Sequence, residues 1–322
     1  PLVRWHCELA RAEPLTSAMH GSDLSLALAR TIAVSTPMVA SVHPADRHLV
    51  KDMLFQLPDL GQAEWETLAA MLERLDEVDR GAVVLELRTY LAVAHLRPIA
   101  AYALERVFAS AAQPDLDLAA IEAALEALQD DPPPGCLRHL GGLVEDSLMA
   151  RLSASGEHPE SLAGLRTMVR RRTEHWASQS SVSRLPGAHL DRLCLEGILI
   201  ARVAHADGKV DAPEMRVCRD FLLREWGLGR FETEFVLNLS LADRFDSLDV
   251  LRVCRWYYEM TTEEERLAFL AMLFALAAVD GDLSKAEVTA LMHVAADLRV
   301  EQEDFHRLFL AHGGIEEPPP LR

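Results

Sequence analysis

One short pattern occurs twice in the C-terminal part of the chain, and it constrains the local fold more than any other feature. The copies lie at residues 203–214 and 276–287, and their Asp-Gly pairs start at Asp207 and Asp280. In each copy an apolar, alanine-rich stretch precedes Asp-Gly, a polar residue, an aliphatic residue, a capping residue and, three positions later, Glu. The repetition indicates an arrangement that the fold uses rather than a chance match.

Each copy predicts a helix, a tight turn and a second helix. The glycine follows the end of a helix, where it can adopt the left-handed conformation that other residues avoid. The capping residue and the Glu three positions later form a capping box, which satisfies backbone amides of the second helix. These residues are Gly208, Asp211 and Glu214 in the first copy, and Gly281, Ser284 and Glu287 in the second. The aliphatic residue between them is expected to fill the bend.

The same pattern also matches the second half of an EF-hand calcium loop, in which Asp, Gly, an aliphatic residue and a bidentate Glu follow in this order. The first and third loop positions lack oxygen ligands here, being Val203 and His205 in one copy and Leu276 and Ala278 in the other. A conventional calcium loop is therefore excluded. The carboxylates that could jointly hold one divalent cation (Ca, Mn or Zn) are Asp207, Asp211, Glu214, Asp280, Asp282 and Glu287. Two interpretations stay open: helix caps alone, or caps with a shared cation site.

Composition favours an all-α fold. Half of the 322 residues are hydrophobic, aromatic residues make up only 6%, and alanine and leucine dominate, which is typical of helices. Before residue 180 we expect helices at 44–56, 62–75, 80–96, 98–112, 115–129, 137–152 and 159–177. After residue 187 we expect helices at 188–206, 212–226, 231–242, 247–259, 263–279, 285–297 and 302–312.

The segment 179–187 is polar and rich in small residues with Pro and Gly, so it predicts a domain boundary. We expect a helical domain of unknown type at 1–180, in which 1–43 is open to an irregular structure. A second helical domain is expected at 186–314, and a disordered tail at 315–322. The printed sequence begins at Pro1 rather than at methionine, which leaves a preceding segment open.

The net charge is −18, and the acidic excess is equal on both sides of residue 180. Such a surface repels phosphate groups, which argues against nucleic acid as a partner. No stretch has the length and apolarity of a membrane span, so no direct membrane insertion is expected. The five cysteines are widely spaced without a CxxC motif, which favours reduced thiols and a cytoplasmic location.

The sequence gives no sign of an enzyme. It lacks a phosphate-binding glycine loop, an HExxH motif and a nucleophile elbow. A di-iron site needs two Glu-x-x-His motifs, whereas Glu303 and His306 form one without a partner. We therefore expect no catalytic residues, and no cofactor other than the cation considered above.

The paired turns and the surrounding helices resemble the TerB-like domain of bacterial tellurite-resistance proteins, over residues 188–312. A related domain occurs in membrane-anchored J-domain co-chaperones. The resemblance implies a compact seven-helix fold and a non-enzymatic module of metal or envelope stress systems, with an acidic metal-binding surface. The positions that match the family pattern are Asp207, Gly208, Glu214, Asp280, Gly281 and Glu287. Residues 1–180 resemble no family that we can name.

Taken together, the sequence predicts an adaptor or sensor module of a stress-resistance system, with a protein partner and an oligomeric state that the sequence does not fix. The alternative is a metal-free scaffold in a larger stress-response or phage-defence assembly. Tyr257 and Tyr258 are neighbours on one expected helix, and adjacent side chains point about 100° apart. One of the two is therefore expected to face outward and to contribute to a partner surface.

Overall fold

A computed structural model describes most of the chain, and all regular secondary structure in its described residues is helical. The described residues are 14–35, 47–109, 118–131, 135–154, 159, 161–172, 186–208, 210, 212–224, 226–242, 248–281, 283–314 and 321. The all-α prediction is confirmed. The chain forms two compact units, Pro1–Gly156 and Glu157–Arg322.

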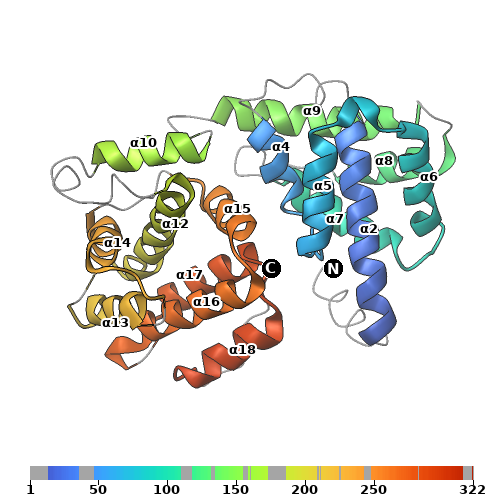
Figure 1. Ribbon diagram of the computed structural model, residues 1–322. Coiled ribbons are helices and arrows are strands. Elements are labelled where there is room, and N and C mark those ends of the chain that lie inside the picture. The colour runs from blue at the N-terminus through green and yellow to red at the C-terminus, as the bar shows by residue number, and fades with distance from the viewer. Residues whose placement is uncertain are drawn as a thin grey trace. The chain divides into compact units, whose positions relative to one another are not determined.

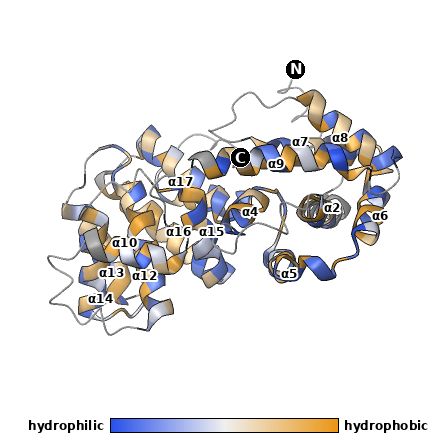
Figure 2. Cartoon of the chain, turned by 90° about the horizontal axis from the view of Figure 1, so that it is seen from above, coloured by the Kyte–Doolittle hydropathy of each residue, from blue (hydrophilic) through white to orange (hydrophobic). Residues whose placement is uncertain are grey.

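The N-terminal unit is arranged around one long helix, α2 (Pro14–Val34). The elements that follow it are α4 (Arg47–Leu54), α5 (Gln62–Leu72), η2 (Leu75–Glu77), α6 (Arg80–Leu91), α7 (Arg97–Phe108), α8 (Leu118–Asp130) and α9 (Leu137–Ala154). Helices α5, α6, α7 and α9 all contact α2. Figure 2 shows α2 nearly end-on with α5 and α6 beside it, which makes α2 the central helix of this unit.

Helix α2 corrects the expectation of irregular structure in residues 1–43. Leu24, Leu28 and Ile32 are fully buried, and the small residues between them are buried as well. The buried Thr31 hydroxyl donates to the Ala27 carbonyl oxygen at 2.8 Å. A helix surrounded by other helices lacks the polar face that makes an amphipathic pattern readable. The rest of the predicted irregular segment, residues 1–13 and 36–43, lies outside the described residues.

The C-terminal unit is arranged around α12 (Gly187–Ala204), which contacts α10, α14, α15, α16 and α17. Figure 1 shows these helices together with the remaining ones of the unit. Their bounds are α10 (Leu162–Arg172), α13 (Ala212–Arg224), α14 (Arg230–Ala242), α15 (Val250–Met260), α16 (Glu263–Ala277), η4 (Ala278–Asp280), α17 (Lys285–Asp297) and α18 (Gln302–Ala311). The bounds of α12 to α18 differ from the predicted ones by only a few residues.

Helix α10 belongs to the C-terminal unit although it precedes the boundary predicted at 179–187. It packs against α12, and the Arg166 Nε lies 2.9 Å from the Asp191 Oδ1. Most of the predicted linker, residues 179–185, lies outside the described residues. The compact C-terminal unit thus includes a helix that the sequence had assigned to the first domain.

Tyr257 and Tyr258 are both buried, so the prediction that one faces outward was wrong. The Tyr257 ring packs on Phe269 with ring centroids 5.0 Å apart. The Arg266 guanidinium lies 4.0 Å from the Tyr258 ring centroid. Each ring is covered by residues of other helices, because α15 is packed on more than one side.

Three smaller predictions concern thiols, membranes and the tail. No disulfide links the four cysteines of the described part, and all four are buried. None of the described helices is long and apolar enough to cross a membrane. Within the tail predicted to be disordered, the Leu321 amide donates to the Gln302 Oε1 at 2.7 Å and its side chain packs on the core. Residues 315–320 and Arg322 lie outside the described part.

Candidate functional site

The two Asp-Gly turns share a glycine with positive φ and an equivalent backbone hydrogen bond. Gly208 has a φ of 85° and Gly281 a φ of 109°, so both adopt positive values. In the first turn the Gly208 amide donates to the His205 carbonyl oxygen at 3.0 Å. In the second, the Gly281 amide donates to the equivalent oxygen, that of Ala278, at 3.1 Å. Both glycines therefore have the positive φ that the sequence predicted.

The second turn is closed by a complete capping box. The Ser284 amide donates to the Glu287 Oε2 at 2.7 Å, and the Glu287 amide donates to the Ser284 Oγ at 3.2 Å. Val210 and Leu283, the aliphatic residues of the two turns, are partly buried and pack against the core, as predicted. In the first copy the predicted cap Asp211 lies outside the described residues. The capping function is therefore observed directly only in the second copy.

The six predicted cation ligands are only partly described. Asp207 is exposed, Glu214 and Glu287 are buried, Asp280 is described in its backbone alone, and Asp211 and Asp282 lie outside the described residues. Glu287 already uses one carboxylate oxygen in its cap. Within the described part, no three His, Cys, Asp or Glu side chains are grouped to hold a metal ion. The described side chains therefore do not by themselves make a cation site.

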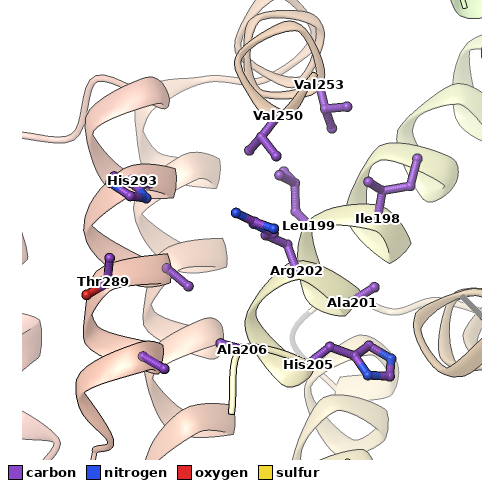
Figure 3. Close-up of a pocket in the computed structure, with 12 residues that line it drawn as sticks. Ile198, Leu199, Ala201, Arg202, His205, Ala206, Val250, Val253, Thr289 and His293 are labelled. Atoms are coloured by element: carbon purple, nitrogen blue, oxygen red, sulfur yellow. The ribbon is translucent and has the colours of Figure 1, made fainter. Parts of the chain in front are cut away.

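A cavity of about 310 Å³ lies between α12, α15 and α17. Both motifs contribute to its walls, because α12 leads into the first turn and α17 follows the second. Figure 3 shows Arg202 of α12 directed into this space, with Thr289 and His293 on the facing helix α17. His205 is turned away, with its Nε2 3.1 Å from the Ser240 carbonyl oxygen of α14. The cavity thus combines one guanidinium with side chains from two helices of the repeated motif.

Comparison with protein families shows what this unit resembles. Residues 197–310 match the family model described as tellurite resistance protein TerB. The C-terminal unit contains a TerB-like domain. The match begins within α12, ends within α18 and includes both Asp-Gly turns, which confirms the predicted resemblance. Searches of curated proteins and of solved structures gave no match.

The C-terminal unit also holds a partly buried charged cluster that no sequence motif indicated. The Arg192 Nε donates to the Glu196 Oε1 at 2.8 Å, and its Nη1 donates to the Glu265 Oε1 at 2.6 Å. The guanidinium lies 4.8 Å from the Trp226 ring centroid. Glu265 is also the Glu of a capping box with Thr262. Arg192 therefore connects α12 to the start of α16 and to an aromatic ring.

Glu196 is the most unusual member of this cluster. Its side chain is fully buried, and its Oε2 has no hydrogen-bond partner among the described residues. Burial raises the pKa of Glu196 to about 8, although the Arg192 guanidinium favours the charged carboxylate. Part of this position was readable in the sequence, because a Glu inside the apolar run 193–204 is uncommon unless it is paired. The lack of a hydrogen-bond partner for its Oε2 could not be predicted from the sequence.

Replacing Gly281 with alanine in the TerB-like domain is expected to lower the free energy of unfolding by about 1–3 kcal/mol. A φ of 109° is strained for any residue with a Cβ. The strain comes from the backbone alone, because a Cβ added at Gly281 would have no neighbouring atom within 4 Å. Urea denaturation measures the loss. The control is Gly164→Ala in α10, where an added Cβ meets only ordinary contacts and the backbone is helical. Equal stability of the Gly281 variant and wild type would contradict the strain argument.

Proposed function

We propose that this chain is a non-enzymatic adaptor of a bacterial stress-resistance system, and that its TerB-like domain presents a rigid helical frame to a protein partner. The carrying observation is the second Asp-Gly turn, whose glycine and capping box use the motif residues for structure. The match to the TerB family supports a module related to tellurite resistance. The role as an adaptor is our own proposal and goes beyond the family match.

The frame depends on both turns, because the helices of one motif pack on those of the other. Helix α12 contacts α16 and α17, and α13 contacts α16 and η4. A change in the angle at either turn would therefore displace helices of both motifs. This coupling gives a fixed arrangement of helices, which is what a docking surface requires.

The charge of the chain indicates the chemistry of the partner. With a net charge of −18, long-range attraction favours a partner with a basic face and disfavours acidic surfaces and nucleic acids. Association with such a partner would become slower and weaker as ionic strength rises.

The adaptor proposal is tested by comparing partners captured by the full chain and by Gly281→Ala. A partner that binds the full chain, and whose recovery falls with the Gly281 variant while Gly164→Ala retains it, would support the frame. The variant must keep its helical circular dichroism for the comparison to count. A partner set that is the same for all three proteins would overturn the proposal.

The second candidate function is a cation sensor, in which a divalent ion bridges the two turns and sets the helix angle. It is favoured by the contact of η4 with α13, which brings the second turn against the helix that carries Glu214. In both copies an Asp also directly precedes the left-handed glycine. Hard cations such as Ca²⁺ and Mn²⁺ bind carboxylate oxygens of this kind.

Calorimetric titration separates the two candidates. Metal-stripped full-length protein is titrated with Ca²⁺, Mn²⁺ and Zn²⁺ beside the double variant Asp207→Asn/Asp280→Asn. A matched control, Asp76→Asn/Asp146→Asn, removes the same charge at two exposed positions of the N-terminal unit. The sensor requires saturable heat that is lost in the motif variant alone. Our primary proposal, with the turns as caps, predicts no saturable heat in any of the three.

A further inference from the structure

We propose that α10 covers a docking groove of the C-terminal unit, and that the protein partner binds there with a basic amphipathic helix that takes the place of α10. The inference rests on the adaptor proposal for the existence of a partner, and it adds the surface and the chemistry of the contact. Figure 1 shows α10 on the outside of the unit, and it packs against α12. The family match, residues 197–310, does not include α10.

The contact between α10 and the rest of the unit is amphipathic. Leu165 and Val169 are at most 1% exposed. Leu162 and Met168 are partly buried and pack against the same core. These apolar residues share one face of the helix, because they recur at spacings of three and four. Thr167, on the other face, is exposed. A helix of the same pattern from another protein would cover the same apolar surface.

An ion pair lies within this contact and sets a requirement for charge. The Arg166 Nε lies 2.9 Å from the Oδ1 of Asp191, a buried residue of α12. This Oδ1 forms no aligned hydrogen bond, so the two groups are held by charge rather than by a directional bond. A helix that covered Asp191 without a cation would bury an unpaired carboxylate, which is costly. The groove therefore selects a helix with a basic residue at this position.

The charge of α10 also fits the surface beneath it. The helix carries Arg166, Arg170, Arg171 and Arg172 and no acidic residue, whereas residues 187–314 have an excess of acidic over basic residues. A basic helix from a partner would be attracted in the same way. The pattern of α10 predicts the partner segment: apolar residues at positions one, four and eight, and a basic residue at position five.

Helix α10 competes with the partner because it belongs to the same chain. The apparent affinity for a partner is lowered in proportion to the fraction of molecules in which the groove is open. Native-state hydrogen exchange of the wild-type chain measures this opening. The amides of α10 are expected to exchange through a local opening of lower free energy than the one that exposes α12. Equal protection of α10 and α12 would make α10 an integral part of the core and would overturn the proposal.

A labelled peptide of residues 159–172 is the probe for the groove, with binding to the full chain followed by fluorescence anisotropy. The variant Leu165→Ala/Val169→Ala weakens the hold of α10 on the groove. It is expected to bind the peptide at least tenfold more tightly than wild type. The control Thr167→Ala, at an exposed position of α10, should bind the peptide as wild type does.

A second peptide separates groove binding from simple charge attraction. It carries Leu165→Ser and Val169→Ser and keeps every arginine, and it is expected not to bind. Equal binding of the two peptides would reduce the response to attraction by an acidic surface and would overturn the proposal.

A charge exchange tests the ion pair without changing the apolar residues. In the full chain, Asp191→Arg faces its own Arg166, so α10 is repelled from the groove. A peptide with Arg166→Glu is expected to bind this variant at least tenfold more tightly than the unchanged peptide does. Circular dichroism checks that the variant keeps its helices. The same affinity for both peptides would remove Asp191 from the recognition of the helix and would overturn the assignment.

Two further results assign the groove differently. Light scattering that shows dimers of wild type, lost in Leu165→Ala/Val169→Ala, would place the α10 of a second copy in the groove instead of a partner. Capture of a partner that depends on Gly281, combined with no peptide binding to the Leu165→Ala/Val169→Ala chain, would keep the adaptor function and exclude this groove as its docking surface. The failure of this inference is therefore distinct from the failure of the adaptor proposal.

Discussion

Replacing Gly197 with alanine is expected to destabilise the TerB-like domain by about 1–3 kcal/mol through overpacking. A Cβ at this position would lie 2.7 Å from the Leu239 Cδ2, 3.0 Å from its Cγ and 3.1 Å from its Cβ. A flexible methyl group can rotate away, but the Cβ of Leu239 is fixed to the backbone of α14. Both residues are in the core. Relief would require α12 and α14 to separate.

The matched control is the same substitution at Gly142, which lies within α9 and has nothing within 4 Å of an added Cβ. There alanine is expected to stabilise its unit by about 0.5–1 kcal/mol, since glycine is a poor helix former. Chemical denaturation of both variants measures the contrast. The change in the free energy of unfolding is expected to have opposite signs at the two positions, because Gly197 faces a neighbouring helix at close range and Gly142 does not.

A double variant tests whether Leu239 causes the loss. Leu239→Ala alone leaves a cavity and is expected to lower the free energy of unfolding by about 2–5 kcal/mol. Combined with Gly197→Ala, the two losses should sum to less than their separate values, because Leu239→Ala removes the Cγ and Cδ2 atoms that an added Cβ would meet at 3.0 and 2.7 Å. Strictly additive losses would show that the Gly197 effect does not arise from these two atoms.

Gly197 illustrates which features of the fold were readable from the sequence. Turns and caps depend on residues within a few positions, so the bounds of α16 and α17 and the cap at Ser284 were predictable. The contact of Gly197 with Leu239 joins residues of different helices, and periodicity carries no information about it. Within the C-terminal unit, capping residues and periodicity therefore predicted where the helices begin and end, whereas their packing was seen only in the structure.

The helix α2 shows the same limit in a different way. Its central position in the N-terminal unit buries apolar and small residues on several sides, so no polar stripe marks its orientation. A sequence pattern identifies helices best when one face meets water. This helix, in which Leu24, Leu28 and Ile32 are fully buried, was accordingly not predicted from the sequence.

Candidate site residues follow the same division. The role of Glu287 could be predicted, because its capping partner is three residues away. Whether Asp207 and Asp280 face each other depends on the crossing of helices, which no spacing in the sequence determines. The cavity at Arg202 depends on α12, α15 and α17 together, and no motif indicated it.

Stability is expected to fall as pH rises from about 4.5 towards 8, through the buried carboxyl of Glu196. Burial raises the pKa of this group to about 8 in the folded state, from an ordinary value of 4.5. Between these values the folded protein binds a proton that the unfolded chain does not. The stability of the protein with Glu196 protonated is therefore fully present below pH 4.5. Ionisation of Glu196 removes part of this stability as pH approaches 8, by a total on the order of a few kcal/mol.

The neighbours of Glu196 do not titrate in this range. Burial raises the pKa of Cys218 to about 12, and it raises the pKa of Tyr257 well above its usual value. Arg192 keeps its charge, because its hydrogen bonds to Glu265 and Glu196 raise the pKa of its guanidinium against the opposing effect of burial. Glu196 is thus the group within the cluster whose charge changes between pH 4.5 and 8.

Urea denaturation of wild type and Glu196→Gln at pH 5, 7 and 8.5 isolates this effect. The chain carries a net charge of −18, and its self-repulsion also varies with pH, so the difference between the two proteins is the relevant quantity. Glu264→Gln, at an exposed position of α16, serves as the control and should follow the wild type. A neutral amide cannot lose a proton, so Glu196→Gln should gain relative stability from pH 5 to 8.5. A constant difference across that range would place the ionisation of Glu196 outside it, and would mean that Arg192 compensates the buried charge.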